Sequence, residues 1–272
     1  MVAIFATIGS IYGGIQAFIW FSGIIKERYF ENEILYQRLR EINTGLNVDF
    51  VESIVGKPAI TKRLPDQLTN NIKTEGGEWE LIDYPSGVGE YTERIYVHKK
   101  YFLQIITNPE GIISSYAVTT RSPDFNPYVP IELYRGESSG KTYPYISNLG
   151  LGKMKLSDLK DYEPDSINIS NWGMQYFYVE SDYFGNPGFY KHYLFGLSPS
   201  GCCVDEDVDY KMLELGMDRE DISMNNPKVK ELRLKLKPNT FGVINGWENK
   251  KLLEYLLKEG LGVNYYDIRE FN

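Results

Sequence analysis

The sequence predicts an α+β fold in which an N-terminal transmembrane helix is followed by two units, each made of a helix and an antiparallel meander. Three observations support this fold class. Residues 2–25 contain no charged residue and are long enough to cross a bilayer. Residues 90–127 alternate short aromatic and β-branched runs with turn residues. A similar arrangement follows at residues 175–195.

The composition argues against two classes of protein. Hydrophobic residues make up 42% of the 272 residues, so the chain can bury a core and is not intrinsically disordered. The formal net charge of −8 argues against broad, non-specific binding of nucleic acid, although a local basic patch is compatible with it. The only cysteines, Cys202 and Cys203, are adjacent. Adjacent cysteines are too close for an ordinary disulfide, so they indicate a reducing compartment.

The uncharged segment predicts a single membrane-spanning helix at residues 1–26. A cleaved signal peptide is the alternative, but the segment has no basic region before it and no convincing small-residue cleavage site. Small residues recur on one face at helical spacing beside a glutamine, and in lipid such a face favours association between helices. We therefore expect a homo-oligomer in contact with the lipid bilayer. The predicted packing residues are Ala6, Gly9, Gly13, Gln16 and Ala17.

The charges beside this segment predict its orientation. Lys26, Arg28, Arg38 and Arg40 follow it, whereas only the α-amino group precedes it. Because basic flanking residues stay on the cytoplasmic side, the chain should be a single-pass protein of the inner membrane with its soluble region in the cytoplasm. A juxtamembrane helix should occupy residues 27–44. The two α+β units should then occupy residues 45–127 and residues 128–272, the second with a C-terminal helix.

The first unit should open with a short helix at residues 46–55 and continue as a three-stranded meander. Pro109 presets a turn conformation and Gly111 tolerates a positive φ. The last two strands should therefore form a hairpin. The predicted strands are Tyr91–His98, Tyr101–Thr107 and Ile112–Thr120.

Aromatic strands recur in the second unit. Strands are expected at Gln175–Glu180 and Phe189–Phe195, joined by a turn at residues 185–188. The apolar positions of Tyr96–Phe102 and Tyr178–Phe184 coincide, which we interpret as a diverged internal duplication. Towards the C-terminus the sequence predicts a strand, in preference to a helix, at Lys228–Lys237, a helix at Trp247–Glu259 and a strand at Val263–Ile268.

The motifs that could support catalysis or metal binding are incomplete. Gly136–Thr142 is one residue short of a phosphate-binding loop. The aspartates at residues 205–209 start like a calcium loop, but the required glycine and glutamate are replaced. His98 and His192 are the only histidines, and neither lies near a nucleophile signature or in a metal-ligand spacing. We therefore predict no catalytic residue, no metal, no cofactor and no enzymatic activity.

Tyr101–Arg121, Asp124–Pro127 and Leu236–Val243 resemble an uncharacterised family of bacterial single-anchor membrane proteins. This resemblance covers most of residues 36–245 and implies no known chemistry. The unit that starts at Gly45–Pro58 also resembles the fold of small outer-membrane assembly lipoproteins, although the lipoprotein cysteine is missing. As an architecture, an anchor with a cytoplasmic β-rich domain is similar to the membrane effectors of anti-phage systems of the Hailong type. In those effectors a nucleotide or short-DNA signal controls a membrane pore.

Two function classes follow. The first is an oligomeric membrane-anchored effector of antiviral defence, a pore or ion channel gated by a nucleotide or short single-stranded DNA bound to the cytoplasmic domain. The second is a non-enzymatic scaffolding or envelope-assembly module that binds another protein. An anionic ligand would need local cations and aromatic groups that stack on bases. The predicted ligand-binding residues are Arg121, Asn126, Tyr128, Arg233, Lys235, Lys237, Asn239 and Phe241.

The basic residues near the C-terminus have two interpretations. Arg233, Lys235 and Lys237 alternate along the predicted strand. Because alternate residues of a strand share a face, their charges would converge on one ligand. The alternative is a solvated strand whose basic residues protect a sheet edge from pairing.

Overall fold

The structure of the protein is a computed structural model. It describes residues 30–73, 79–128, 150–158, 164–172, 175–185, 190–218, 222–246 and 249–269. The chain divides into two compact units, residues 1–41 and residues 42–272. In the first unit residues 30–40 form a helix, within the segment predicted as the juxtamembrane helix.

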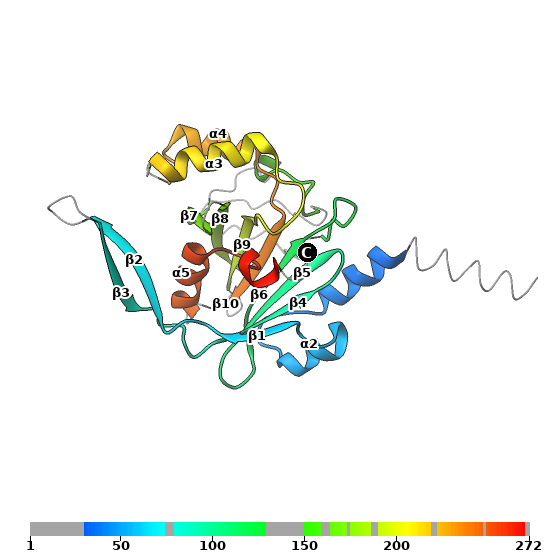
Figure 1. The fold of residues 1–272 in the computed structure, drawn as a ribbon. Helices are drawn as coiled ribbons and strands as arrows, with labels where there is room; N and C mark the ends of the chain where they lie inside the picture. Colours follow the sequence, from blue (N-terminus) through cyan, green and yellow to red (C-terminus); the bar gives the residue numbers. More distant parts are fainter. Residues whose placement is uncertain are drawn as a thin grey trace, which may run out of the picture. The chain divides into compact units, whose positions relative to one another are not determined.

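The second unit is built on an eight-stranded antiparallel sheet (Figure 1). Its strand order is β1-β4-β5-β6-β10-β9-β8-β7. Two further strands, β2 (Gln67–Lys73) and β3 (Trp79–Pro85), pair only with each other among the described residues. The strands of the large sheet are β1 (Ile60–Arg63), β4 (Thr92–Val97), β5 (Tyr101–Thr107), β6 (Ile113–Thr120), β7 (Ser166–Trp172), β8 (Gln175–Phe184), β9 (Lys191–Leu197) and β10 (Thr240–Asn245).

The hairpin predicted between β5 and β6 is confirmed. The backbone N–H of Asn108 donates to the carbonyl of Ile112 at 3.0 Å, and Gly111 donates back to Asn108 at 3.0 Å. Gly111 has a φ of 76°, which a residue with a side chain adopts at a cost. The turn residues therefore set the register of the two strands.

The predicted fold class is wrong, because the two meanders are not separate units. β10 pairs with β6 on one side and with β9 on the other, so Phe241 lies opposite both Val118 and Phe195. The meanders β4-β5-β6 and β7-β8-β9 thus lie in mirrored order about β10 within one sheet. Such pairing joins strands that are far apart in sequence, and local patterns carry no signal for it.

The membrane helix in that fold class also finds no counterpart. None of the helices in the described ranges has the length and apolar character needed to cross a membrane. The predicted span, residues 1–26, lies outside the described residues. The same holds for its predicted packing residues Ala6, Gly9, Gly13, Gln16 and Ala17.

The sequence similarity that suggested a duplication does not mark a structural repeat. Tyr96–Phe102 spans the end of β4, a turn and the start of β5, whereas Tyr178–Phe184 lies within the single strand β8. The shared apolar positions reflect the aromatic content of both segments and not an equivalent place in the fold.

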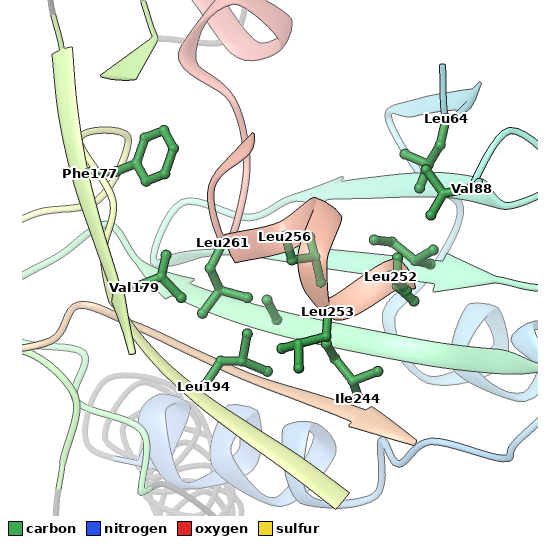
Figure 2. Close-up of a cluster of buried hydrophobic side chains, with 12 residues drawn as sticks. Leu64, Val88, Phe177, Val179, Leu194, Ile244, Leu252, Leu253, Leu256 and Leu261 are labelled. Carbon is green, nitrogen blue, oxygen red and sulfur yellow. The ribbon is translucent and has the colours of Figure 1, made fainter. Parts of the chain in front are cut away.

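Helix α5 (Lys250–Glu259) covers one face of the sheet (Figure 2). Leu252, Leu253 and Leu256 lie at helical spacing and pack against β-strand residues that include Leu194 and Ile244. Burial of each such side chain contributes about 1.5–3 kcal/mol. The helix ends at Gly260, with a φ of 97°, and both the helix and its stop confirm the prediction for this segment.

The opposite face of β8 is covered by a second layer of helices. Helix α3 (Glu206–Asp218) packs on β7 and β8, and α4 (Pro227–Lys235) packs on α3 and on the 3-10 turn η1 (Leu156–Asp158). Because side chains alternate along a strand, Val179 of β8 faces α5 while Glu180 faces α4. The remaining helices are α2 (Val48–Val55) and α6 (Tyr265–Ile268).

Two segments predicted as strands are helices. The Asn226 side chain caps α4 by accepting from the backbone of Lys228 at 2.9 Å, and proline occupies its first turn. Val229, Leu232 and Leu236 are buried at helical spacing, whereas Leu234 is 59% exposed. The alternation of Lys228–Lys237 was thus a misleading signal, and the predicted strand at Val263–Ile268 is likewise replaced by α6, which Asn264 caps.

Candidate functional site

Arg121 holds two strands together at the end of β6. Its guanidinium Nη1 donates to the His98 carbonyl at 2.9 Å, and its Cζ lies 4.2 Å from the centroid of the Phe102 ring. Partial burial lowers the pKa of Arg121. The charge predicted to bind a ligand is therefore engaged by the β4–β5 turn and by a buried aromatic ring.

Arg233 is buried against the sheet, and the prediction that it shares an exposed strand face with Lys235 and Lys237 is wrong. Its Nε lies 2.9 Å from Glu180 Oε2 and its Nη2 lies 3.2 Å from Glu180 Oε1. The Tyr178 hydroxyl donates to the same carboxylate at 2.6 Å. Burial raises the pKa of Glu180, while Arg233 and Tyr178 act against that rise. The group joins α4 to β8.

The structure nevertheless brings together two parts of the chain that carry predicted ligand-binding residues, residues 126–128 and residues 236–239. A segment at residues 150–156 lies between them and hydrogen-bonds to both. Leu151 N–H donates to the Pro127 carbonyl at 3.1 Å, and Gly152 N–H donates to the Pro238 carbonyl at 2.7 Å. Leu156 N–H then donates to the Leu236 carbonyl at 3.0 Å. Residues 126–128 and 236–239 are therefore neighbours, although strands β7, β8 and β9 lie between them in sequence.

The two predicted asparagines brace this arrangement from inside. Asn239 is 1% exposed, and its Oδ1 accepts from Ser198 N–H at 2.8 Å. Its Nδ2 donates to the carbonyls of Ser198 at 2.8 Å and Cys202 at 3.1 Å. Asn126 Nδ2 donates to the Leu151 carbonyl at 2.9 Å. Both amides position loops, so neither presents its polar atoms to a ligand.

The two predicted aromatic residues differ in exposure. Phe241 is buried in the centre of the sheet, with its ring centroid 5.5 Å from that of Phe195, so it cannot stack on a base. Tyr128 is 39% exposed and pairs with Gly150 in an isolated β-bridge. It therefore lies beside residues 150–156 with part of its ring accessible to solvent.

Four exposed lysines lie on the two hydrogen-bonded segments next to Tyr128. Two of them precede and follow Met154 in sequence, and the other two precede and follow Leu236. Among the described residues no ion pair joins any of them to an acidic side chain. We call this group the lysine surface; it consists of Lys153, Lys155, Lys235 and Lys237.

The acidic groups closest in sequence to the lysine surface already have other partners. Glu231 on α4 pairs with Lys211, and Lys211, with a smaller effect of Lys235, lowers the pKa of Glu231. The Asp158 carboxylate accepts from the backbone N–H of Lys155 at 2.8 Å. Four exposed lysines therefore lie on two paired backbone segments of a chain whose net charge is −8.

Lys153 and Lys155 escaped the sequence prediction. The signal was present, because two lysines alternate with apolar residues in Gly152–Leu156 within an otherwise acidic chain. Their relation to Lys235 and Lys237 depends on backbone pairing between distant loops, which no local pattern records.

The two histidines lie in different surroundings. His98 stacks on Tyr101 with ring centroids 4.7 Å apart, and its Nδ1 accepts from Lys100 N–H. His192 is 5% exposed, and its Nε2 has no hydrogen-bond partner in the described part of the chain. Burial lowers the pKa of His192. Within the described ranges no three His, Cys, Asp or Glu residues are grouped as metal ligands would be.

No protein-family model, curated protein or solved structure matches this chain.

Proposed function

We propose that residues 42–272 form a non-catalytic sensor domain that binds a phosphate-bearing ligand on the lysine surface. The ligand class is a nucleotide or a short single-stranded DNA. The observation that carries this function is a set of four exposed lysines that form no ion pair with another described residue. They lie on two paired segments, one of which also pairs with Tyr128.

The chemistry of the lysine surface suits a phosphate group. An ammonium group binds phosphate as a point charge and needs no fixed bidentate geometry. The backbone below the lysines is braced by Asn126 and Asn239, so little loop ordering has to accompany binding. Tyr128 adds a ring face on which a base can stack, worth about 1–3 kcal/mol for single-stranded nucleic acid.

The scaffolding alternative requires different behaviour. A protein-binding module would use shape and apolar contacts, and its affinity would respond weakly to salt. Gating of a membrane pore, oligomerisation, a place in the inner membrane and a role in anti-phage defence stay predictions from the sequence.

Binding of a fluorescent oligodeoxythymidine to the purified full chain tests the proposal directly. Fluorescence anisotropy should report binding that weakens steeply as salt rises, because bound phosphates release counterions. Inorganic phosphate and a mononucleotide, added as competitors, distinguish recognition of a single phosphate from recognition of a strand.

Two double variants and one matched control give the test its specificity. Lys153→Ala with Lys155→Ala, and Lys235→Ala with Lys237→Ala, should each weaken binding about tenfold or more. Lys57→Ala with Lys99→Ala removes the same charge from exposed positions elsewhere and should leave binding nearly unchanged. Equal loss in all three proteins, or binding that is insensitive to salt, would show that the lysine surface is not the site.

A further inference from the structure

Cys202 and Cys203 adopt an unusual backbone geometry in the loop after β9. Cys203 has a φ of 68°, and no other non-glycine residue in the described ranges has a positive φ. Side chains of adjacent residues point to opposite sides of an extended chain, but the positive φ of Cys203 takes this pair out of the extended conformation. Cys203 is exposed and Cys202 is partly buried. The loop therefore presents a dithiol with one accessible sulfur.

The peptide between the two cysteines is part of the support for the lysine surface. The Cys202 carbonyl belongs to that peptide and accepts from Asn239 Nδ2 at 3.1 Å, while Cys202 N–H donates to the Thr120 carbonyl at 2.8 Å. Gly201 packs so closely that a Cβ there would lie 2.5 Å from Asn239 Nδ2. Asn239 follows Pro238, whose carbonyl holds Gly152.

We propose that Cys202 and Cys203 are a modification site that a small-molecule disulfide, such as glutathione disulfide, converts into a reversible vicinal disulfide, and that this modification weakens ligand binding on the lysine surface. The second part rests on the proposed function. Adjacent Cα atoms are about 3.8 Å apart, below the usual range of about 4.4–6.8 Å for a disulfide. The ring is therefore strained and easily reduced.

The reaction proceeds by two exchanges. The Cys203 thiolate attacks one sulfur of glutathione disulfide, which forms a mixed disulfide and releases one glutathione thiolate. Cys202 loses its proton to solvent and attacks the Cys203 sulfur, which releases the second glutathione thiolate. The two cysteines lose two electrons, and glutathione disulfide gains them and becomes two glutathione thiols.

Ring closure acts on the lysine surface through one bond. The closed ring contains the Cys202–Cys203 peptide and forces it to rotate, so the Cys202 carbonyl turns away from Asn239. Asn239 then loses one of the acceptors that hold residues 236–239 in place. Lys235 and Lys237 lose their fixed relation to Lys153 and Lys155.

The pH dependence of ring closure provides a signature of this geometry. Burial, and then the neighbouring Cys203 thiol, raise the pKa of Cys202 to about 12. The second exchange needs the Cys202 thiolate, and burial still disfavours that thiolate when Cys203 carries glutathione, so the rate should keep rising between about pH 7 and about pH 9. An ordinary exposed thiol, with a pKa of about 8.5, would level off within that range.

Intact-mass measurement of the full chain after treatment with glutathione disulfide tests the modification. The wild type should end lighter by two hydrogen atoms, with no thiol left for iodoacetamide, and dithiothreitol should reverse the change. Cys202→Ser should stop at the glutathione adduct, and Cys203→Ser should react far more slowly. Lasting accumulation of the adduct in the wild type, or ring closure whose rate levels off near pH 8.5, would overturn the proposed site.

Anisotropy with the labelled oligodeoxythymidine tests the link to binding separately. The oxidised wild type should bind several-fold more weakly than the reduced protein, and Cys202→Ser should bind as the reduced protein does. Equal binding by the oxidised and reduced forms would refute the link through Asn239. Absence of binding in both forms would instead refute the proposed function, while the mass measurement would still decide whether the disulfide forms.

Discussion

Arg233 and Lys235 are two residues apart in sequence, yet they meet opposite surroundings. Arg233 lies inside, 8% exposed, and pairs with a carboxylate and a tyrosine on β8. Lys235, in the last turn of the same helix, is exposed and has no ion pair among the described residues. The helical turn rotates one cation into the core and leaves the other in solvent. Basic residues that look equivalent in sequence thus divide into one that holds the fold and one that is available to a ligand.

The sharpest test of this difference removes each cation in turn. Arg233→Ala leaves the Glu180 carboxylate buried without its partner and should lower the free energy of unfolding by about 3–5 kcal/mol. Lys235→Ala should change it by less than about 0.5 kcal/mol. Urea denaturation of the full chain measures both values.

A double variant separates the cost of an unpaired charge from the value of the pair. Arg233→Met with Glu180→Leu removes both charges and should recover most of the lost stability, because apolar residues can replace a buried ion pair at little cost. A single-variant loss below about 1 kcal/mol would mean that Arg233 and Glu180 contribute little to joining α4 and β8.

Removal of the exposed lysines should affect ligand binding and not stability. Lys235→Ala with Lys237→Ala should reduce the slope of log affinity against log salt by about 1.4, since each phosphate contact to a single strand contributes about 0.7. The stability of this variant should match that of the wild type. An unchanged slope would place these lysines with the solvated surface residues.

A smaller effect on stability is expected at the N-terminal cap of α4, the helix that buries Arg233 and exposes Lys235. Asn226→Ala removes the acceptor for Lys228 N–H and should lower the free energy of unfolding by about 1 kcal/mol. Asn226→Asp keeps an acceptor and is the matched control. If both variants behave like the wild type, the cap does not determine where α4 begins.

The smallest effect is expected at His192, a buried titratable side chain that, unlike Arg233, has no ion-pair partner among the described residues. His192 is buried with no partner for Nε2 in the described residues, and burial lowers its pKa. The folded state therefore holds fewer protons than the unfolded state below the ordinary histidine pKa of about 6.5. Stability from this group is fully present above that pH and declines as pH falls towards the lowered pKa. His192→Gln should lose this part of the pH dependence, as denaturation at neutral and mildly acidic pH would show.

The candidate site was predictable in part. Lys235, Lys237 and Tyr128 are predicted as ligand-binding because cations and an exposed ring are what a phosphate-bearing ligand needs. The structure exposes all three, and their role in binding stays a prediction. Arg121, Arg233 and Phe241 were chosen by the same reasoning, and the structure uses all three internally. Residue type indicates which chemistry is available, but burial decides whether it is available to a ligand.

Two elements of this protein follow from short stretches of its sequence. The β5–β6 hairpin follows from its turn residues, and α5 follows from a leucine stripe that ends at a glycine. Interactions within a few residues set both, so a short window contains their causes. Three features depend on contacts between distant parts of the chain: β10 joins two meanders into one sheet, Lys228–Lys237 contains a helix, and the two segments that carry the four lysines pair with each other. Each of these outcomes depends on backbone pairing or burial against residues far away in the chain. A short window of sequence contains only one side of such a contact, so it cannot predict the free energy that the contact contributes.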